Sequence, residues 1–180
     1  MVRTRVGYTG GEMIGPTYEA MGDHTEALQI YFDPAVVSLE EMVERFWRSH
    51  SPIVSMRSLQ YRSAIWYADE HQRKVINDAK QKIAKDYSAP IQTAVLPLGP
   101  FYRAEDYHQK YSLQRHGKLM KVFAKIYPEF RHFVDSTAAA RLNGNVLGSA
   151  NKMVDQDWQQ YGILADEMRR IAGVKNALKR

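Results

Sequence analysis

The chain has 180 residues, 44% of them hydrophobic and 25% charged, a composition that fits one folded domain and excludes a chain disordered throughout. It contains no cysteine, which excludes disulfides, thiolate metal sites and thiol catalysis by these residues. The formal net charge of +5 is typical of a solvated basic surface, and without a nucleic-acid recognition motif it indicates at most weak contact with a polyanion.

The N-terminal part of the chain predicts two strands and a helix. Alternation of side chains predicts strands over residues 3–9 and 25–32, each followed by turn-forming glycine or proline. Apolar residues then recur at helical spacing over residues 38–50. Ser38 and Glu41 stand three residues apart at the start of this helix, as in a capping box that satisfies backbone N–H groups of the first turn.

The middle of the chain continues the alternation of strands and helices. We expect a strand over residues 62–67, a polar helix over residues 69–86 and a further strand over residues 91–96, and then a short helix over residues 104–114. Strands that alternate with helices and then give way to helices alone predict an α+β protein. The expected architecture is a two-layer, ferredoxin-like sandwich of a small mixed sheet with helices.

The last third of the chain predicts helical pieces only. Breaks are expected at Gly117, Pro128, Gly144, Gly148 and Gly162. We therefore divide the chain into a first domain, residues 1–112, and a helical C-terminal extension, residues 113–180. No apolar run approaches the roughly 18 residues of a membrane span, and the first residues lack the apolar segment of a secretory signal. We therefore predict a cytoplasmic protein without a membrane partner.

Polar side chains that could bind a ligand or transfer a proton gather in the glycine-rich turns of residues 7–26. These turns carry Tyr8, Tyr18, His24 and Glu26. Glu26 opens an otherwise apolar strand, where desolvation would let it act as a general acid near neutral pH. A solvated strand end is the alternative interpretation.

Two further segments carry candidate ligand-binding side chains. Tyr61 precedes the strand expected over residues 62–67, and its hydroxyl could donate to a ligand oxygen, although packing of the ring is the alternative. Residues 101–111 hold Glu105 and His108 at helical i, i+3 spacing. Two side chains without a third ligand make a poor metal site, so no metal is predicted.

The order of these segments is more specific than any one of them. Five segments follow one another: VGYTGG, GPTYEAMGDHTEALQIYFDP, LEEMVERFWRSHSP, QYRSAIWY and FYRAEDYHQKY. In this order and at these separations they resemble the A-type peptide methionine sulfoxide reductases, over residues 3–112. The resemblance implies reduction of methionine-S-sulfoxide, free or in proteins, to methionine. In the family a cysteine thiolate attacks the sulfur while an acid protonates the oxygen, and thioredoxin is the reductant; no other cofactor is implied.

The resemblance implies roles for particular residues. Tyr18 and Tyr61 match the family's substrate-binding tyrosines, of which the one at Tyr18 binds the sulfoxide oxygen, and Glu26 matches its catalytic proton donor. The residues expected to support the site are His24, Tyr107 and His108.

The sequence also departs from the family's pattern. The opening strand that carries glycine-cysteine-phenylalanine-tryptophan is absent, and with it the nucleophile. One extra residue stands between Gly22 and His24. The aspartate usual in the loop before Tyr61 is missing, and the shorter segment 54–59 stands in its place.

Three explanations of the missing thiol stay open. The first is an incomplete gene product, from a downstream start or a selenocysteine codon read as a stop. The second is a pseudoenzyme that binds methionine-sulfoxide peptides or proteins. The third is a protein-interaction module that uses its helical extension as the contact surface. In each case we expect a catalytically inactive chain that is weakly stable, or that dimerises through a sheet edge left open.

Overall fold

Strands from distant parts of the chain pair in a small three-stranded sheet. The computed structural model describes residues 2–55 and 58–149. In these residues the sheet has the order β2-β1-β5 and comprises β1 (Arg3–Thr9), β2 (Thr25–Tyr31) and β5 (Tyr102–Arg103). β1 and β5 are antiparallel, with Tyr8 opposite Tyr102. The first two strands are confirmed, whereas β5, only two residues long, was not predicted.

A second sheet consists of two parallel strands, β3 (Ala64–Tyr67) and β4 (Ala94–Pro97), with Ala64 opposite Ala94. Parallel neighbours need a long crossover connection, and α2 (Glu70–Ile83) supplies it. Both strands lie close to their predicted ranges. Among the described residues the strands of the predicted fold form two groups, β3 paired with β4 and β1 between β2 and β5. The α+β class is confirmed.

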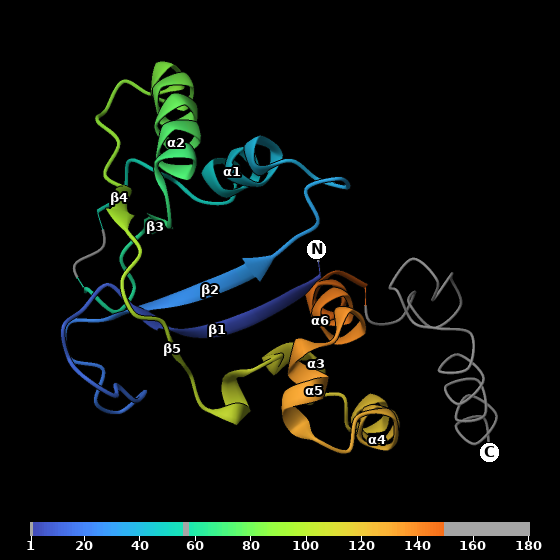
Figure 1. The fold of residues 1–180 in the computed structure, drawn as a ribbon. Coiled ribbons are helices and arrows are strands. Elements are labelled where there is room, and N and C mark those ends of the chain that lie inside the picture. Colours follow the sequence, from blue (N-terminus) through green and yellow to red (C-terminus); the bar gives the residue numbers. More distant parts are fainter. Residues whose placement is uncertain (1, 56–57, 150–180) are drawn as a thin grey trace. The chain divides into compact units, whose positions relative to one another are not determined.

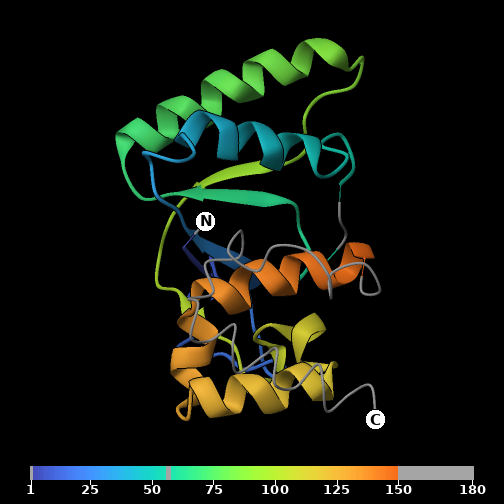
Figure 2. The same cartoon turned by 90° about the vertical axis from the view of Figure 1, so that its right-hand side faces the viewer.

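Helices α1 (Leu39–Arg48) and α2 cover one face of the parallel pair (Figure 2). The predicted capping box of α1 is confirmed: Ser38 Oγ accepts the Glu41 N–H at 3.1 Å, and the Glu41 carboxylate accepts the Ser38 N–H at 2.9 Å. The core between helices and strands is built on Val43, Trp47 and Ile76. A 3-10 turn, η1 (Ala84–Asp86), completes the second predicted helix.

The chain divides into two compact units. The sheet–helix unit comprises residues 6–28 and 33–105, and the helical unit comprises residues 1–5 and 29–32 with the chain from residue 106 on. β1 and β2, the blue strands of Figure 1, each contribute residues to both units. The division at residue 112 stays a prediction.

The helical unit contains α3 (Tyr111–Gln114), α4 (Gly117–Ile126), α5 (Phe130–Asp135) and α6 (Thr137–Ser149) among its described residues. They bury a core centred on Leu113, Phe123, Phe133 and Leu142. Within the described ranges, no helix is long and apolar enough to cross a membrane.

Helix boundaries in this unit agree only in part with the expected breaks. α4 begins at Gly117 and ends before Pro128. α6 runs through Gly144 and Gly148, so the breaks predicted there are wrong. A glycine costs a helix about 1 kcal/mol, which the burial of Leu142 in the core offsets. The break expected at Gly162 lies outside the described residues.

The helix expected over residues 104–114 is also wrong. The structure has a 3-10 turn, η2 (Asp106–His108), and then the four-residue α3. Lys110 separates them with a φ of 52°, in the left-handed region that interrupts a helix. Its buried ammonium donates to Thr4 O and Thr4 Oγ1, at 2.5 and 2.8 Å. This tertiary contact fixes Lys110 in the conformation that ends the helix.

Candidate functional site

The glycine-rich loop between β1 and β2 is held by two side chains that follow it. His24 is fully buried; its Nδ1 accepts the Gly11 N–H at 3.2 Å, so Nε2 carries the hydrogen and donates to Met13 O at 2.8 Å. The Asp23 carboxylate accepts the N–H groups of Glu12 and Met13. These hydrogen bonds lower the pKa of Asp23, because they favour its charged form.

Glu105 anchors the same loop from the other side of β1. Its Oε2 accepts the Tyr8 hydroxyl at 2.6 Å, and its Oε1 accepts the backbone N–H of Tyr18 at 2.9 Å. Glu105 therefore joins the Tyr8 side chain of β1 to the backbone of Tyr18, one carboxylate oxygen for each. Glu105 lies before η2, so the helical face it was expected to share with His108 does not exist. Within residues 2–55 and 58–149, no group of three or more His, Asp or Glu side chains could hold a metal ion.

The segment before β3 is joined to the start of β2. The Glu26 N–H donates to Gln60 O at 3.0 Å, and Thr25 Oγ1 donates to Leu59 O at 2.8 Å. Arg62 Nε in turn donates to Thr25 Oγ1 at 2.8 Å. These contacts bring Tyr61 and Glu26, which are 35 positions apart in the sequence, to one place on the surface.

Tyr18, Tyr61 and Glu26 converge at this place. The Tyr18 and Tyr61 side chains are hydrogen-bonded to each other, and Gln60 Nε2 donates to both Tyr61 Oη and Glu26 Oε1, at 2.9 Å each. Bonding to Tyr18, desolvation and the charge of Glu26 raise the pKa of Tyr61. The two tyrosine side chains are 41% and 50% exposed, so a ligand can reach the hydroxyl groups.

The six residues singled out in the sequence have different surroundings. Glu26 is exposed, so the desolvation expected for it from its apolar strand is wrong. His24 binds the loop through both ring nitrogens, which is a structural contact. Tyr107 and His108 belong to the helical unit, where their rings lie 4.2 Å apart; their support of the site stays a prediction.

Gln60 and Glu105 were not predicted as site residues. Gln60 is part of the QYRS segment, but its side-chain contacts depend on a rotamer that sequence does not specify. Glu105 binds partners 87 and 97 positions away. The substituted loop before Tyr61 lies partly outside the described residues, since these exclude residues 56–57.

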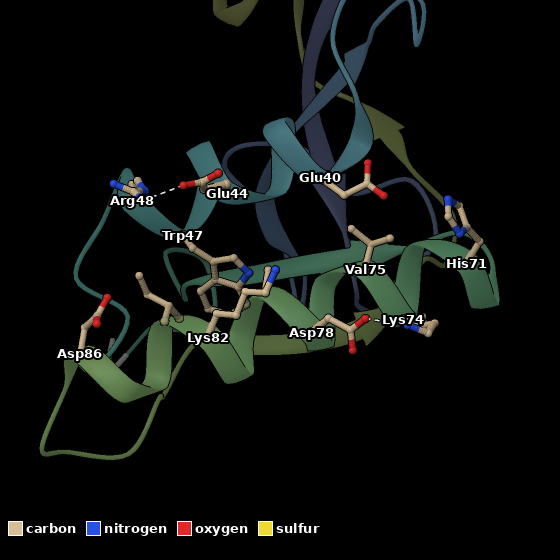
Figure 3. A pocket seen from close by; sticks show the side chains of 12 residues that line it. Glu40, Glu44, Trp47, Arg48, His71, Lys74, Val75, Asp78, Lys82 and Asp86 are labelled. Atoms are coloured by element: carbon tan, nitrogen blue, oxygen red, sulfur yellow. Dashed lines mark hydrogen bonds and ion pairs between the residues drawn. The ribbon is translucent and has the colours of Figure 1, made fainter.

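A cavity of about 630 Å³ lies between α1 and α2 (Figure 3). Two ion pairs within single helices line it, Arg48 with Glu44 at 2.6 Å in α1 and Lys74 with Asp78 at 2.7 Å in α2. None of the six predicted site residues lines it. This cavity is thus separate from the cluster of Tyr18, Tyr61 and Glu26.

The converging residues lie in a segment that matches a known family of proteins. The family model described as peptide methionine sulfoxide reductase matches residues 1–142. The chain belongs to the peptide methionine sulfoxide reductase family. The resemblance found in residues 3–112 is confirmed, and the match continues into the part of the chain that was expected to be an extension.

Relatives within this family are similar over much of the chain. A peptide methionine sulfoxide reductase of Drosophila melanogaster is 40% identical over 151 residues, which are 82% of this chain and 60% of that protein. One of Methanosarcina acetivorans is 39% identical over 122 residues, 62% of this chain and 65% of that protein. The chain thus spans about three fifths of the length of these relatives.

Solved structures of methionine sulfoxide reductases have a similar fold. Methionine sulfoxide reductase A of Corynebacterium diphtheriae gives a TM-score of 0.54 at 32% identity, over 63% of each chain. Reduced Mxr1 from Saccharomyces cerevisiae gives 0.58 at 29% identity, over 63% of this chain and 71% of that chain.

Proposed function

We propose that the sheet–helix unit binds methionine-S-sulfoxide, free or within a protein, at Tyr18, Tyr61 and Glu26. The observation that carries this proposal is the convergence of two phenol groups and a carboxyl group, linked by hydrogen bonds, at one exposed place. A sulfoxide oxygen is a strong hydrogen-bond acceptor, and phenol and carboxylic acid groups are suited to donate to it. His24, Tyr107 and His108 support the site in this proposal.

The reaction of the family needs a sulfur nucleophile as well as this binding site. A thiolate would attack the sulfoxide sulfur while Glu26 donates a proton to the oxygen, leaving methionine and a sulfenic acid. These 180 residues contain no cysteine. We therefore propose that this polypeptide binds the sulfoxide without reducing it, as a pseudoenzyme, and that thioredoxin is a partner only of a form that has the thiol. We propose the cytoplasm as its location.

Calorimetric titration with a peptide that contains methionine-S-sulfoxide tests the binding site. We expect saturable binding, weaker for the same peptide with unoxidised methionine, and a loss of about tenfold in affinity for Tyr61→Phe or Glu26→Gln, because each removes one hydrogen-bonding group. Tyr111→Phe, an exposed tyrosine of the helical unit, is the matched control. Absence of binding, or equal affinity in all four proteins, contradicts the proposal.

A turnover assay tests the absence of catalysis. Loss of a covalent nucleophile can lower a rate by about 10⁶, so dithiothreitol and the protein together should yield no methionine above the dithiothreitol blank. Chromatographic detection of methionine makes the measurement, with a cysteine-containing member of the family as the positive control. Protein-dependent formation of methionine contradicts this part of the proposal.

A further inference from the structure

Gln60 contacts Glu26 through its backbone and its side chain. Its carbonyl oxygen accepts the Glu26 N–H at 3.0 Å, and its Nε2 donates to Glu26 Oε1 at 2.9 Å. The same Nε2 donates to Tyr61 Oη at 2.9 Å. One amide group therefore joins the carboxyl group and the phenol group of the proposed binding site.

The chemistry of the amide fixes the direction of both hydrogen bonds. A primary amide nitrogen carries two hydrogens and accepts none. Glu26 Oε1 accepts this hydrogen bond whether or not Oε2 carries a proton, whereas the opposite orientation of the amide would set its carbonyl oxygen against Glu26 Oε1 and is unfavourable. Glu26 Oε1 and Tyr61 Oη are thus both acceptors from Gln60. Each of these two oxygen atoms therefore already accepts one hydrogen bond before any ligand binds.

Two neighbours of the Tyr61 hydroxyl act on its pKa in opposite directions. The hydrogen bond with Tyr18 raises the pKa of Tyr61, which means that it favours the protonated phenol, whereas the hydrogen bond from Gln60 lowers the pKa because it favours the phenolate. Tyr61 Oη therefore accepts from Gln60 Nε2 at 2.9 Å, and the Gln60 amide and the Tyr18 side chain shift the pKa of Tyr61 in opposite directions.

We infer that Gln60 is a positioning residue: its amide holds Glu26 Oε1 and Tyr61 Oη, so that Glu26 Oε2 is left to contact the oxygen of a bound sulfoxide. Because this polypeptide has no cysteine to attack the sulfur, no S–O bond breaks. A protonated Glu26 Oε2 donates a hydrogen bond to the substrate oxygen and keeps its proton. The sulfoxide part of this inference rests on the proposed function; the orientation of Glu26 and Tyr61 does not.

Gln60→Met tests the inference, because methionine keeps the length of the side chain and lacks both donors. Gln92→Met is the matched control: Gln92 is exposed in the same unit, and within the described residues its side-chain amide has the one partner Pro90 O, at 3.4 Å. Titration of Tyr61, followed by the Cζ resonance of ¹³C-labelled tyrosine, reports on the network without a ligand. Calorimetry with the methionine-S-sulfoxide peptide reports on binding.

We expect Gln60→Met to raise the pKa of Tyr61, Tyr18→Phe to lower it, and Gln92→Met to leave it unchanged. Affinity for the sulfoxide peptide should fall about tenfold in Gln60→Met. The double variant Gln60→Met/Glu26→Gln should lose less than the sum of the two single losses, because the residues act together. A purely structural role for Gln60 would lower the thermal midpoint and leave the titration of Tyr61 unmoved.

The possible failures are distinguishable. If the wild type binds the sulfoxide peptide and Gln60→Met binds it equally, or if Tyr61 titrates identically in both, the inference is wrong. If the wild type does not bind the peptide, the proposed function fails, and the titration of Tyr61 alone decides whether Gln60 orients it. Should Gln60→Met not fold, Gln60→Asn replaces it, since the shorter amide cannot reach both partners.

Discussion

At the scale of single residues, Gly11 allows the loop to close on Asp23 and His24. A Cβ atom at Gly11 would lie 2.3 Å from Asp23 Oδ1 and 2.7 Å from the His24 backbone nitrogen. We predict that Gly11→Ala lowers the free energy of unfolding by about 1–3 kcal/mol, because the backbone of His24 must shift. Urea denaturation makes the measurement. Gly99→Ala is the control, since its Cβ would meet no atom within 4 Å, and an equal loss in both variants contradicts the prediction.

Asp23 should make the stability of the protein depend on acid pH. Its pKa in the folded protein lies below the ordinary value, because backbone N–H groups of Glu12 and Met13 stabilise the carboxylate. The stabilisation is therefore complete above the unfolded pKa of about 3.9 and is lost as the pH falls through the lower, folded value.

Asp23→Asn is expected to reduce this acid dependence. Denaturation midpoints measured between pH 6 and pH 2 should fall less steeply in the variant than in the wild type. Asp86→Asn is the comparison, since Asp86 is exposed and its carboxylate accepts no hydrogen bond in the part of the chain that the structure describes. Parallel pH profiles for Asp23→Asn and the wild type would refute the prediction.

The sequence predicted which side chains lie near one another better than it predicted their individual contacts. The motifs containing Tyr18, Glu26 and Tyr61 are local, and the structure brings these three side chains together. The apolar sequence around Glu26 did not predict that its side chain is exposed, because burial depends on which other residues cover that end of β2. The bonds of Glu105 to Tyr8 and Tyr18 join residues far apart in the sequence. Such contacts follow from the assembled fold and leave no periodic signal.

At the scale of elements, the start of α1 depends on its capping box. We predict that Ser38→Ala lowers the free energy of unfolding by about 1 kcal/mol, because the Glu41 N–H loses its acceptor. Urea denaturation tests this, with the exposed loop substitution Ser88→Ala as control. A loss for Ser38→Ala no larger than that for Ser88→Ala would show that the cap contributes nothing.

Elements with a strong local signal were the ones that sequence predicted. α1 has a capping box and an apolar stripe, and β1 has clear alternation and a glycine turn, so their ranges agree with the structure. β5 is too short for alternation to appear. The break at Lys110 follows from its hydrogen bonds to Thr4, 106 positions away. A contact across that separation overrides the helical pattern of the segment.

At the scale of the whole molecule, the β3–β4 pair is expected to limit stability. Parallel pairing is slightly less stable per residue than antiparallel pairing, and two-stranded sheets are marginal without further support. Each strand of this pair also has an outer edge within the described sheet. We predict a low unfolding midpoint or self-association through an edge. Sedimentation and thermal melts over a range of protein concentrations test this, and a concentration-independent monomer with a sharp, reversible melt contradicts it.

The ion pair between Arg5 and Asp135 has a consequence for the order of events during synthesis. Two hydrogen bonds join these side chains across 130 positions, and Lys110 is joined to Thr4 across 106. At about 5–20 residues per second, a ribosome needs roughly 6–26 s to add 130 residues. The first strand must therefore wait that long before its partners in the helical unit exist. During this interval β1 can pair with β2, which is synthesised soon after it, while the side chains of Thr4 and Arg5 still lack their partners in the helical unit.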